Sequence, residues 1–393
     1  MKLGVELNSQ QVRALYDIEN WWARGNDQVF EISGAAGTGK TFLVNYFIDR
    51  IGLDLRDVAF TAFAGKAAMQ LARNGLPAQT IHSLIYNHEK TPDLDENGKL
   101  QFAANGKLLT KFQFTLKDRL FKDPKLIVVD EASMVNKNLA EDLLSFGVPI
   151  IALGDLNQLP PVIGNPFFLV NPNFVLTQIM RQAENDPIVW LSQRVLNNQR
   201  IPYRPYGKSS VNEKAALDAH ALLTTDVVLT ATNSLRKKIN DLYRHELLNI
   251  KKPEMPMIGE KIMCVKNDWS RSIDNSIYMM NGLSGFVDYV EMESFNGKEL
   301  KIDFRPDFIS KKFKNVRLDY KTLYDAYTDE NAKRFSRLAQ FEYAYAMTVH
   351  KSQGSQWPTV IFLEERSGWD SDTFRRLMYT AITRAQEAIH IYR

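Results

Sequence analysis

The sequence predicts an α/β protein whose core is a parallel β-sheet. Short apolar runs rich in β-branched residues recur along the chain, and such runs are typical of strands buried on both faces of a parallel sheet. Helical patterns separate several of these runs, and this alternation indicates α/β architecture. The expected strands are QVFEIS, DVAFTAF, KLIVVDEAS, PIIALGD, DVVLTAT and TVIFLEE, with helices at TFLVNYFIDRIG and GKAAMQLARNG.

Length and composition indicate a multidomain globular protein. The chain has 393 residues, which exceeds the size at which a single core stops growing, so we expect two or more domains. Hydrophobic residues make up 45% and charged residues 24%, values that exclude wholesale disorder. The net charge of +3 does not by itself indicate a nucleic-acid binder, so any polyanion site must be local.

The sequence predicts neither a membrane segment nor a signal peptide. No apolar run approaches the roughly 20 residues needed to span a bilayer, and acidic residues interrupt the N-terminal segment. We therefore expect a cytoplasmic protein without membrane contact. The single cysteine, Cys264, excludes an intramolecular disulfide and a multi-cysteine zinc site, and we expect it to be a small buried hydrophobe.

Two segments break the alternation of strands and helices and are candidate insertions. The first, residues 86–121, contains Asn97-Gly98, a strong short-range hairpin signal. The second, residues 285–337, contains Asn296-Gly297 and is predicted to be a small all-β module. Its residues 311–321 carry five basic residues against one acid, which fits either a solvated strand face or a nucleic-acid contact.

The segment EISGAAGTGKTF has the spacing of a phosphate-binding loop, G-x-x-x-x-G-K-T, between a predicted strand and a predicted helix. In that context backbone N–H groups and the helix N-terminus converge on anionic phosphates. Lys40 is expected to reach the β and γ phosphates, and the Thr41 hydroxyl to bind Mg²⁺. The predicted nucleotide-binding residues are Gly34, Ala35, Ala36, Gly37, Thr38, Gly39, Lys40 and Thr41.

Polar residues at two further strand ends fit the same chemistry. Asp130 follows four apolar residues, and Glu131 comes next. We expect Asp130 to order the Mg²⁺ water shell and Glu131 to activate the attacking water; the alternative is a helix N-cap that the dipole favours. Gln158 after IIALGD is a candidate γ-phosphate sensor, although polar residues there commonly make only a turn.

Six segments occur in the order and relative spacing of the superfamily 1 helicase motifs. They are GAAGTGKT, VVDEASM, GDLNQLPPV, LTQIMRQ, MTVHKSQGSQW and YTAITRAQ. The chain most closely resembles the RecD and Dda branch, superfamily 1B, from Leu7 to Arg384. The resemblance implies two RecA-like parallel-sheet P-loop NTPase domains, residues 1–85 with 122–190 and residues 191–284 with 338–393.

The resemblance also gives the two insertions a meaning. Residues 86–121 stand where this branch carries a strand-separating hairpin, the pin. Residues 285–337 stand where relatives carry a small SH3-like β insertion. That insertion would press on the pin, hold DNA through residues 311–321, or act as a passive buttress.

In this family ATP lies in a cleft between the two RecA-like domains, so residues far apart in sequence complete the site. The resemblance implies that Gln11 recognises the adenine and that Arg181 and Arg384 reach the γ-phosphate. A planar, permanently charged guanidinium suits that role because it neutralises charge on the transferring phosphoryl oxygens. The implied cofactors are ATP and Mg²⁺.

For nucleic acid the resemblance implies a single-strand track. Phe63 stands where many relatives carry threonine, and it would stack on a base or pack beneath the sheet. Asn233 would meet a phosphate or cap a helix. The implied DNA-contact residues are Thr61, Phe63, Thr80, His82, Asn233, His350 and Lys351.

The activity that the resemblance implies is ATP- and Mg²⁺-dependent movement 5′ to 3′ on single-stranded DNA with separation of the duplex ahead. The implied partners are single-stranded DNA, its junctions with duplex, and a single-strand-binding or replication protein, with the chain acting as a monomer. The alternatives are an ATPase that translocates or remodels without unwinding, and a binding protein whose hydrolysis times release. A small-molecule kinase would need an acceptor site in place of the second-domain arginines, and YTAITRA argues against it.

Overall fold

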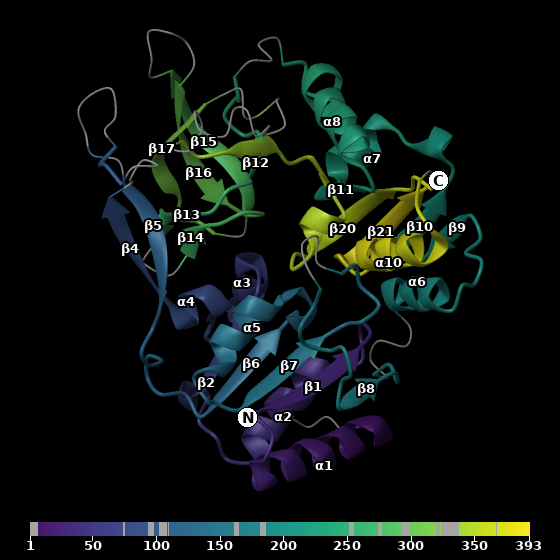
Figure 1. Cartoon of the computed structure of the whole chain (residues 1–393). Helices are drawn as coiled ribbons and strands as arrows, with labels where there is room; N and C mark the ends of the chain where they lie inside the picture. The colour runs from purple at the N-terminus through teal and green to yellow at the C-terminus, as the bar shows by residue number, and fades with distance from the viewer. Residues whose placement is uncertain are drawn as a thin grey trace.

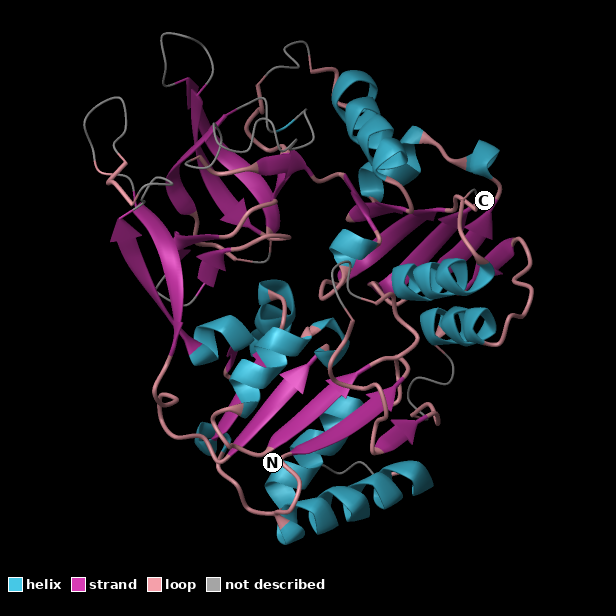
Figure 2. Ribbon diagram, in the orientation of Figure 1, coloured by secondary structure: helices cyan, strands magenta, loops and turns pink. Residues whose placement is uncertain are grey.

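The computed structural model describes residues 7–73, 75–92, 98–101, 108, 110–160, 165–180, 186–250, 255–273, 277–292, 299–307, 309–319, 323, 338–366 and 368–393. Figure 1 shows one α/β unit at the bottom, a second at the upper right, and a group of antiparallel strands at the upper left. Helices pack on the sheets of both α/β units (Figure 2). The α/β prediction with a parallel-sheet core is therefore confirmed.

The first unit is built on a parallel sheet of order β3-β2-β6-β7-β1-β8. Burial on both faces explains why its strands are almost continuously apolar. Ser33 of β1 lies beside Gly154 of β7, and Asp130 of β6 lies beside Ala62 of β2, so the predicted nucleotide residues follow neighbouring strand ends. The strands are β1 (Val29–Gly34), β2 (Val58–Ala62), β3 (Ala78–Thr80), β6 (Leu126–Asp130), β7 (Ile150–Gly154) and β8 (Phe174–Leu176).

Helices cover this first sheet and bury one apolar side each. The first helix, α1, begins after Asn8, whose side chain accepts from the Gln11 N–H at 2.9 Å while the Gln11 side chain accepts from the Asn8 N–H at 3.1 Å. This reciprocal cap satisfies two donors that a helix start leaves open. The helices are α1 (Ser9–Arg24), α2 (Lys40–Arg50), α3 (Gly65–Arg73), α4 (Ile81–Ile85) and α5 (Lys137–Leu144), with 3-10 turns η1 (Leu55–Asp57) and η2 (Ala132–Met134).

The second unit has a sheet of order β19-β11-β20-β21-β10-β9, parallel except for β9. Its strands are β9 (Arg204–Tyr206), β10 (Ser209–Asn212), β11 (Val227–Thr230), β19 (Ala346–Thr348), β20 (Trp357–Leu363) and β21 (Ala385–Tyr392). Its helical segments are α6 (Pro187–Leu196), η4 (Lys214–Ala216), α7 (Ala219–Thr224), α8 (Asn233–Leu242), η5 (Tyr243–Leu247), η8 (His350–Ser352) and α10 (Ser371–Ile382).

The predicted end of the first domain at residue 190 is wrong, because it cuts through α6. Ile188, Leu191 and Val195 of this helix are buried in one core cluster with α10 and β21. Burying that apolar face fixes α6 to the second unit. The second unit therefore already includes Pro187.

An antiparallel hairpin rises from the first unit within the first predicted insertion. It consists of β4 (Tyr86–Pro92) and β5 (Thr110–Leu116), paired from Tyr86 with Leu116 to Pro92 with Thr110. The hairpin signal at Asn97-Gly98 falls between these two strands, and Asn97 lies outside the described residues. At the base, Lys117 Nζ donates to the carbonyls of Ser83 at 2.8 Å and Leu84 at 2.9 Å, and anchors the hairpin to α4.

The antiparallel module at the upper left of Figure 1 is larger than the predicted segment 285–337. Its sheet has the order β17-β16-β15-β12-β18. The predicted start, residue 285, falls inside β15. Strands β12 and β18 lie outside the predicted segment but belong to the same sheet, because they pair with its strands and share its core. The strands are β12 (Lys261–Cys264), β15 (Ser284–Met292), β16 (Glu299–Pro306), β17 (Phe313–Asp319) and β18 (Phe341–Tyr343), beside a hairpin of β13 (Asp268–Ile273) and β14 (Ile277–Met279).

Two expectations about this module have different outcomes. Cys264 is buried in its core as predicted, and burial raises the pKa of its thiol to about 12. Asn296-Gly297 lies outside the described residues.

Among the residues that the structure describes, no helix has both the length and the apolar character that crossing a bilayer requires.

Candidate nucleotide site and interdomain contacts

The loop between β1 and α2 depends on glycine at both ends. Gly37 and Gly39 have φ of 81° and 76°, a region that side chains rarely adopt. A Cβ on Gly39 would lie 2.5 Å from Met180 Sδ, and one on Gly34 would lie 2.7 Å from Thr38 Oγ1. The glycine spacing of the motif is therefore a steric requirement of this fold.

The loop is suited to an anion. The N-cap of α2 is Gly39, which offers no side chain to the N–H groups of the first turn, and phosphate oxygens satisfy such groups. Lys40 lies over the loop, and its Nζ donates to the carbonyls of Gly34 at 2.6 Å and Ala35 at 3.2 Å. Thr41 is half-buried in the first turn of α2. These residues fit a phosphate chain with its divalent cation.

Gln11 lies against this loop. It is buried, and its Nε2 donates to the Thr38 carbonyl at 3.2 Å while its Oε1 completes the cap of α1. Gln11, the residue predicted to recognise adenine, therefore also links α1 to the phosphate loop through a hydrogen bond. The adenine contact itself stays a prediction.

Asp130 and Glu131 lie at the end of β6. Burial and the adjacent Glu131 raise the pKa of Asp130 to about 6, while the Lys40 ammonium opposes this shift. A cation beside such a carboxylate would stabilise its ionised form. Asp130 Oδ1 also accepts from the Glu131 N–H at 3.0 Å.

The helix N-cap alternative for this acid pair holds for the position of Glu131 but not for a capping bond. Glu131 stands at the N-cap position of η2, but its side chain makes no capping hydrogen bond. Its φ is 50°, a left-handed conformation that is uncommon for a residue with a side chain. Strain of this kind is concentrated at functional sites.

The loop after β7 is held by the second unit. Thr380 Oγ1 of α10 accepts from the Leu159 N–H at 2.9 Å, and Gln353 Nε2 donates to the Leu159 carbonyl at 2.6 Å. Arg376 Nη1 donates to the carbonyls of Leu156 at 2.6 Å and Gln158 at 3.4 Å. The predicted γ-phosphate sensor Gln158 is therefore half-buried on the seam between the two units.

The two predicted arginines have different outcomes. Arg384 is buried beneath α10, where it donates to the carbonyls of Thr380 at 3.1 Å and Ser355 at 3.3 Å. Both partners belong to the second unit, and the contact of Arg384 with the γ-phosphate stays a prediction. Arg181 lies outside the described residues.

Two of the predicted DNA-contact residues, Thr61 and Thr80, use their hydroxyls for hydrogen bonds within the first unit. Thr61 is fully buried, and its hydroxyl donates to the Val128 carbonyl at 3.0 Å. Thr80 is buried and caps α4 by accepting from the Ser83 N–H at 3.1 Å. The structure thus contradicts both as exposed DNA contacts, because their hydroxyls satisfy buried backbone groups.

Phe63 and His82 meet at the base of the hairpin. Their ring centroids lie 6.3 Å apart, and His82 lies 6.4 Å from the Phe114 ring and 5.6 Å from the Tyr86 ring. Burial lowers the pKa of His82, which favours the neutral ring. Sequence reasoning missed Phe114, although the alternation in KFQFTL places it on one face of a strand. It is 39% exposed.

The remaining DNA candidates lie on the second unit. Asn233 is exposed at the start of α8, and the N-cap alternative for it is wrong because Thr232 caps the helix. Lys351 Nζ lies 2.7 Å from Glu342 Oε2 and is thus paired with a carboxylate. The His350 ring stacks on Trp369 at 6.3 Å, and burial lowers the pKa of His350.

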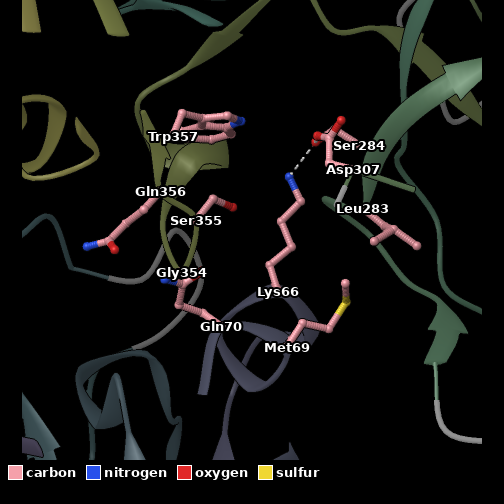
Figure 3. Close-up of a pocket in the computed structure, with 10 residues that line it drawn as sticks. All are labelled: Lys66, Met69, Gln70, Leu283, Ser284, Asp307, Gly354, Ser355, Gln356 and Trp357. Atoms are coloured by element: carbon pink, nitrogen blue, oxygen red, sulfur yellow. Dashed lines mark hydrogen bonds between the residues drawn. The ribbon is translucent and has the colours of Figure 1, made fainter. Parts of the chain in front are cut away.

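A basic residue that sequence reasoning did not select joins three parts of the molecule. Lys66 of α3 donates from Nζ to Ser284 Oγ at 2.9 Å, and Ser284 donates to Asp307 Oδ2 at 2.5 Å (Figure 3). Its Nζ also lies 5.3 Å from the centroid of the Trp357 ring. Burial lowers the pKa of Lys66 to about 8, with Asp307 opposing the shift. These residues line a small pocket, with a cavity volume of about 40 Å³, between the first unit, the second unit and the antiparallel module.

Comparison with known proteins identifies relatives of both units. A family model described as an AAA domain matches residues 6–201, and one described as a UvrD-like helicase C-terminal domain matches residues 343–392. The chain is 25% identical over 394 residues to an ATP-dependent RecD2 DNA helicase of Deinococcus radiodurans, covering 91% of this chain and 46% of the relative. It is also 25% identical to an ATP-dependent DNA helicase Pif1 of Campylobacter jejuni, covering 84% and 81%.

The fold matches that of solved Pif1 structures. A Bacteroides Pif1 helicase in complex with ADP-AlF3 and single-stranded DNA superimposes with a TM-score of 0.53 at 17% identity, covering 98% of this chain and 92% of that one. The chain spans less than half the length of the RecD2 relative. Its motif order, its matched family models and these relatives agree, and the chain belongs to superfamily 1B, among the RecD/Pif1-like helicases.

Proposed function

We propose that the protein is an ATP- and Mg²⁺-dependent DNA helicase that moves 5′ to 3′ on single-stranded DNA and separates the duplex ahead of it. One observation carries the proposal: the phosphate loop and the loop after β7 of the first unit are hydrogen-bonded to α10 of the second unit. A nucleotide bound at that seam contacts both units, so its binding and hydrolysis bias their relative position.

The residues divide the work of hydrolysis. Lys40 and the N–H groups of its loop hold the phosphates, and Glu131 orients and deprotonates the attacking water. Gln158, Arg181 and Arg384 are the residues proposed to respond to the γ-phosphate. Thr41 and Asp130 would hold Mg²⁺, which would supply positive charge against the phosphates.

Several features support DNA as the track. The RecD2 and Pif1 relatives are named as DNA helicases, and a similar Pif1 fold was solved with single-stranded DNA. In this chain Phe114 on the hairpin is partly exposed, and stacking of an aromatic side chain on a base tolerates any sequence. The proposed partners are single-stranded DNA and its junctions with duplex.

A strand-displacement assay tests the function. A labelled strand on a partial duplex with a 5′ overhang is expected to be released only with ATP and Mg²⁺, while a 3′ overhang gives no release. Release from the 3′ overhang alone would overturn the direction. ATP hydrolysis stimulated by DNA without any strand release would favour a translocase or remodeller that does not unwind.

Shortening the hairpin tests its role as a pin. Replacing residues 90–112 by a short Gly-Ser linker keeps Phe114 and the anchors at Tyr86 and Lys117, because Tyr86 bonds to Asp142 and Lys117 to α4. We expect strand displacement to fall about tenfold or more while DNA-stimulated ATP hydrolysis stays within about twofold. Hydrolysis and displacement are measured on the same preparation, and an equal loss of both would refute the pin assignment.

A further inference from the structure

The geometry points to Tyr379 as a positioning residue that couples the second unit to the phosphate loop through one hydroxyl group. The inference rests on the proposed function and assigns to this tyrosine a role separate from those of Arg181 and Arg384. Tyr379 lies on α10 and is fully buried. Its hydroxyl accepts from the Ala36 N–H at 2.9 Å and donates to Asp155 Oδ2.

The direction of these two hydrogen bonds is fixed by chemistry. The Ala36 N–H is only a donor, and an ionised Asp155 carboxylate is only an acceptor. A single phenol hydroxyl satisfies both, since it offers one proton and accepts with its lone pairs. Burial and Asp155 raise the pKa of Tyr379 far above its usual range, so the hydroxyl keeps its proton.

The contacted peptide unit is held from its other end by the phosphate-binding lysine. The Ala35 carbonyl and the Ala36 N–H belong to one planar peptide group. Lys40 Nζ donates to that carbonyl at 3.2 Å, and Tyr379 accepts from that N–H. The second unit and Lys40 thus act on the same rigid group, so the position of α10 and the orientation of this peptide are linked.

Asp155 extends the link toward Gln158. Its Oδ1 accepts from the Asn157 N–H at 3.0 Å and from Asn157 Nδ2 at 3.1 Å. Oδ2 of the same carboxylate accepts from Tyr379. Because Asp155 is buried, loss of the tyrosine hydroxyl removes a partner that water does not readily replace.

The contacts made by its neighbours on α10 set Tyr379 apart. Thr380 and Arg376 bond to the loop after β7. Tyr379 bonds to that loop through Asp155 and also to the phosphate loop. We infer that when the two units separate, the Ala36 N–H and Asp155 lose a shared partner, and that their rejoining restores the hydrolytic arrangement.

Tyr379→Phe tests this inference, because it removes the hydroxyl and keeps the ring. The matched control is Tyr243→Phe, which removes another buried hydroxyl, one that donates to the Leu222 carbonyl inside the second unit. We expect Tyr379→Phe to lower the kcat of DNA-stimulated ATP hydrolysis about tenfold, with KM for ATP changed less than about threefold. Tyr243→Phe is expected to lower Tm by about as much as Tyr379→Phe does, and to leave kcat within about twofold of the wild-type value.

A double-mutant cycle adds a readout that a purely structural role does not move. In a chain that already carries Asp155→Asn, Tyr379→Phe is expected to lower kcat by less than about threefold. The hydrogen bond between Tyr379 and Asp155 is already altered in that chain. If Tyr379→Phe does not fold, Asp155→Asn alone carries the test, with a fall in kcat expected at unchanged nucleotide binding.

The outcomes distinguish a failure of the proposed function from a failure of the coupling role of Tyr379. A wild-type chain that hydrolyses no ATP with single-stranded DNA would overturn the proposed function and this inference together. Wild-type hydrolysis with Tyr379→Phe indistinguishable from Tyr243→Phe in kcat and Tm would overturn only the coupling role. Strictly additive effects of the Tyr379 and Asp155 substitutions would overturn it as well.

Discussion

Lys40→Ala is expected to lower DNA-stimulated ATP hydrolysis by about 10²- to 10³-fold, the loss typical of removing one group that stabilises developing charge. The Lys40 ammonium already lies over the phosphate loop, bonded to the Gly34 and Ala35 carbonyls. Because it lies on the first turn of α2 outside the buried core, its truncation removes charge without opening a cavity. Release of inorganic phosphate with and without single-stranded DNA measures the effect.

Lys137→Ala is the matched control for this lysine. Lys137 starts α5 and pairs with Glu141 at 3.6 Å on an exposed helix face. Exposed pairs of that kind contribute little, so hydrolysis and Tm are expected to match the wild type. A Lys40→Ala chain with wild-type turnover would show that the loop is not the phosphate site.

Glu131→Gln is expected to block hydrolysis while preserving nucleotide binding. Amide for carboxylate keeps the size of the side chain at the strained φ of 50° but removes its ability to take a proton from water. General-base catalysis contributes about 10²- to 10⁴-fold, so kcat is expected to fall by at least about 10². Burial, the main cause of the raised pKa of Asp130, remains in this variant, while the smaller contribution of the Glu131 charge is removed.

Two measurements on one preparation check this substitution. Titration of a fluorescent ATP analogue is expected to give a Kd within about threefold of the wild type, while phosphate release stops. Glu141→Gln on the exposed face of α5 serves as the control for loss of one negative charge. Loss of nucleotide binding together with hydrolysis would instead assign Glu131 a structural role.

Much of the fold was predictable because it depends on local patterns. Buried parallel strands need apolar runs, and the segments around β1, β6, β7, β11 and β20 have them. Domain edges were predicted less well. The packing of α6 depends on which sheet covers its apolar face, and residues 261–264 join the antiparallel module through pairings with strands far along the chain.

The candidate site divides in the same way. The sequence by itself predicted the phosphate loop, since the positive φ of Gly39 favours glycine and a Cβ on Gly34 would meet Thr38, four positions along the chain. It also placed Asp130 and Glu131 at a strand end. It did not distinguish exposed from buried threonines, so Thr61 was assigned to a DNA surface although its hydroxyl closes a contact inside the sheet.

Only the tertiary structure decided how the two units meet. Ala36 and Tyr379 are separated by 343 positions, and Lys66 and Ser284 by 218. No local spacing encodes such pairs, because they form when separately folded surfaces pack and their buried donors and acceptors must find partners. The sequence thus predicted the loop that we propose for the phosphates, and the packing of the two units decided which hydroxyl bonds to that loop.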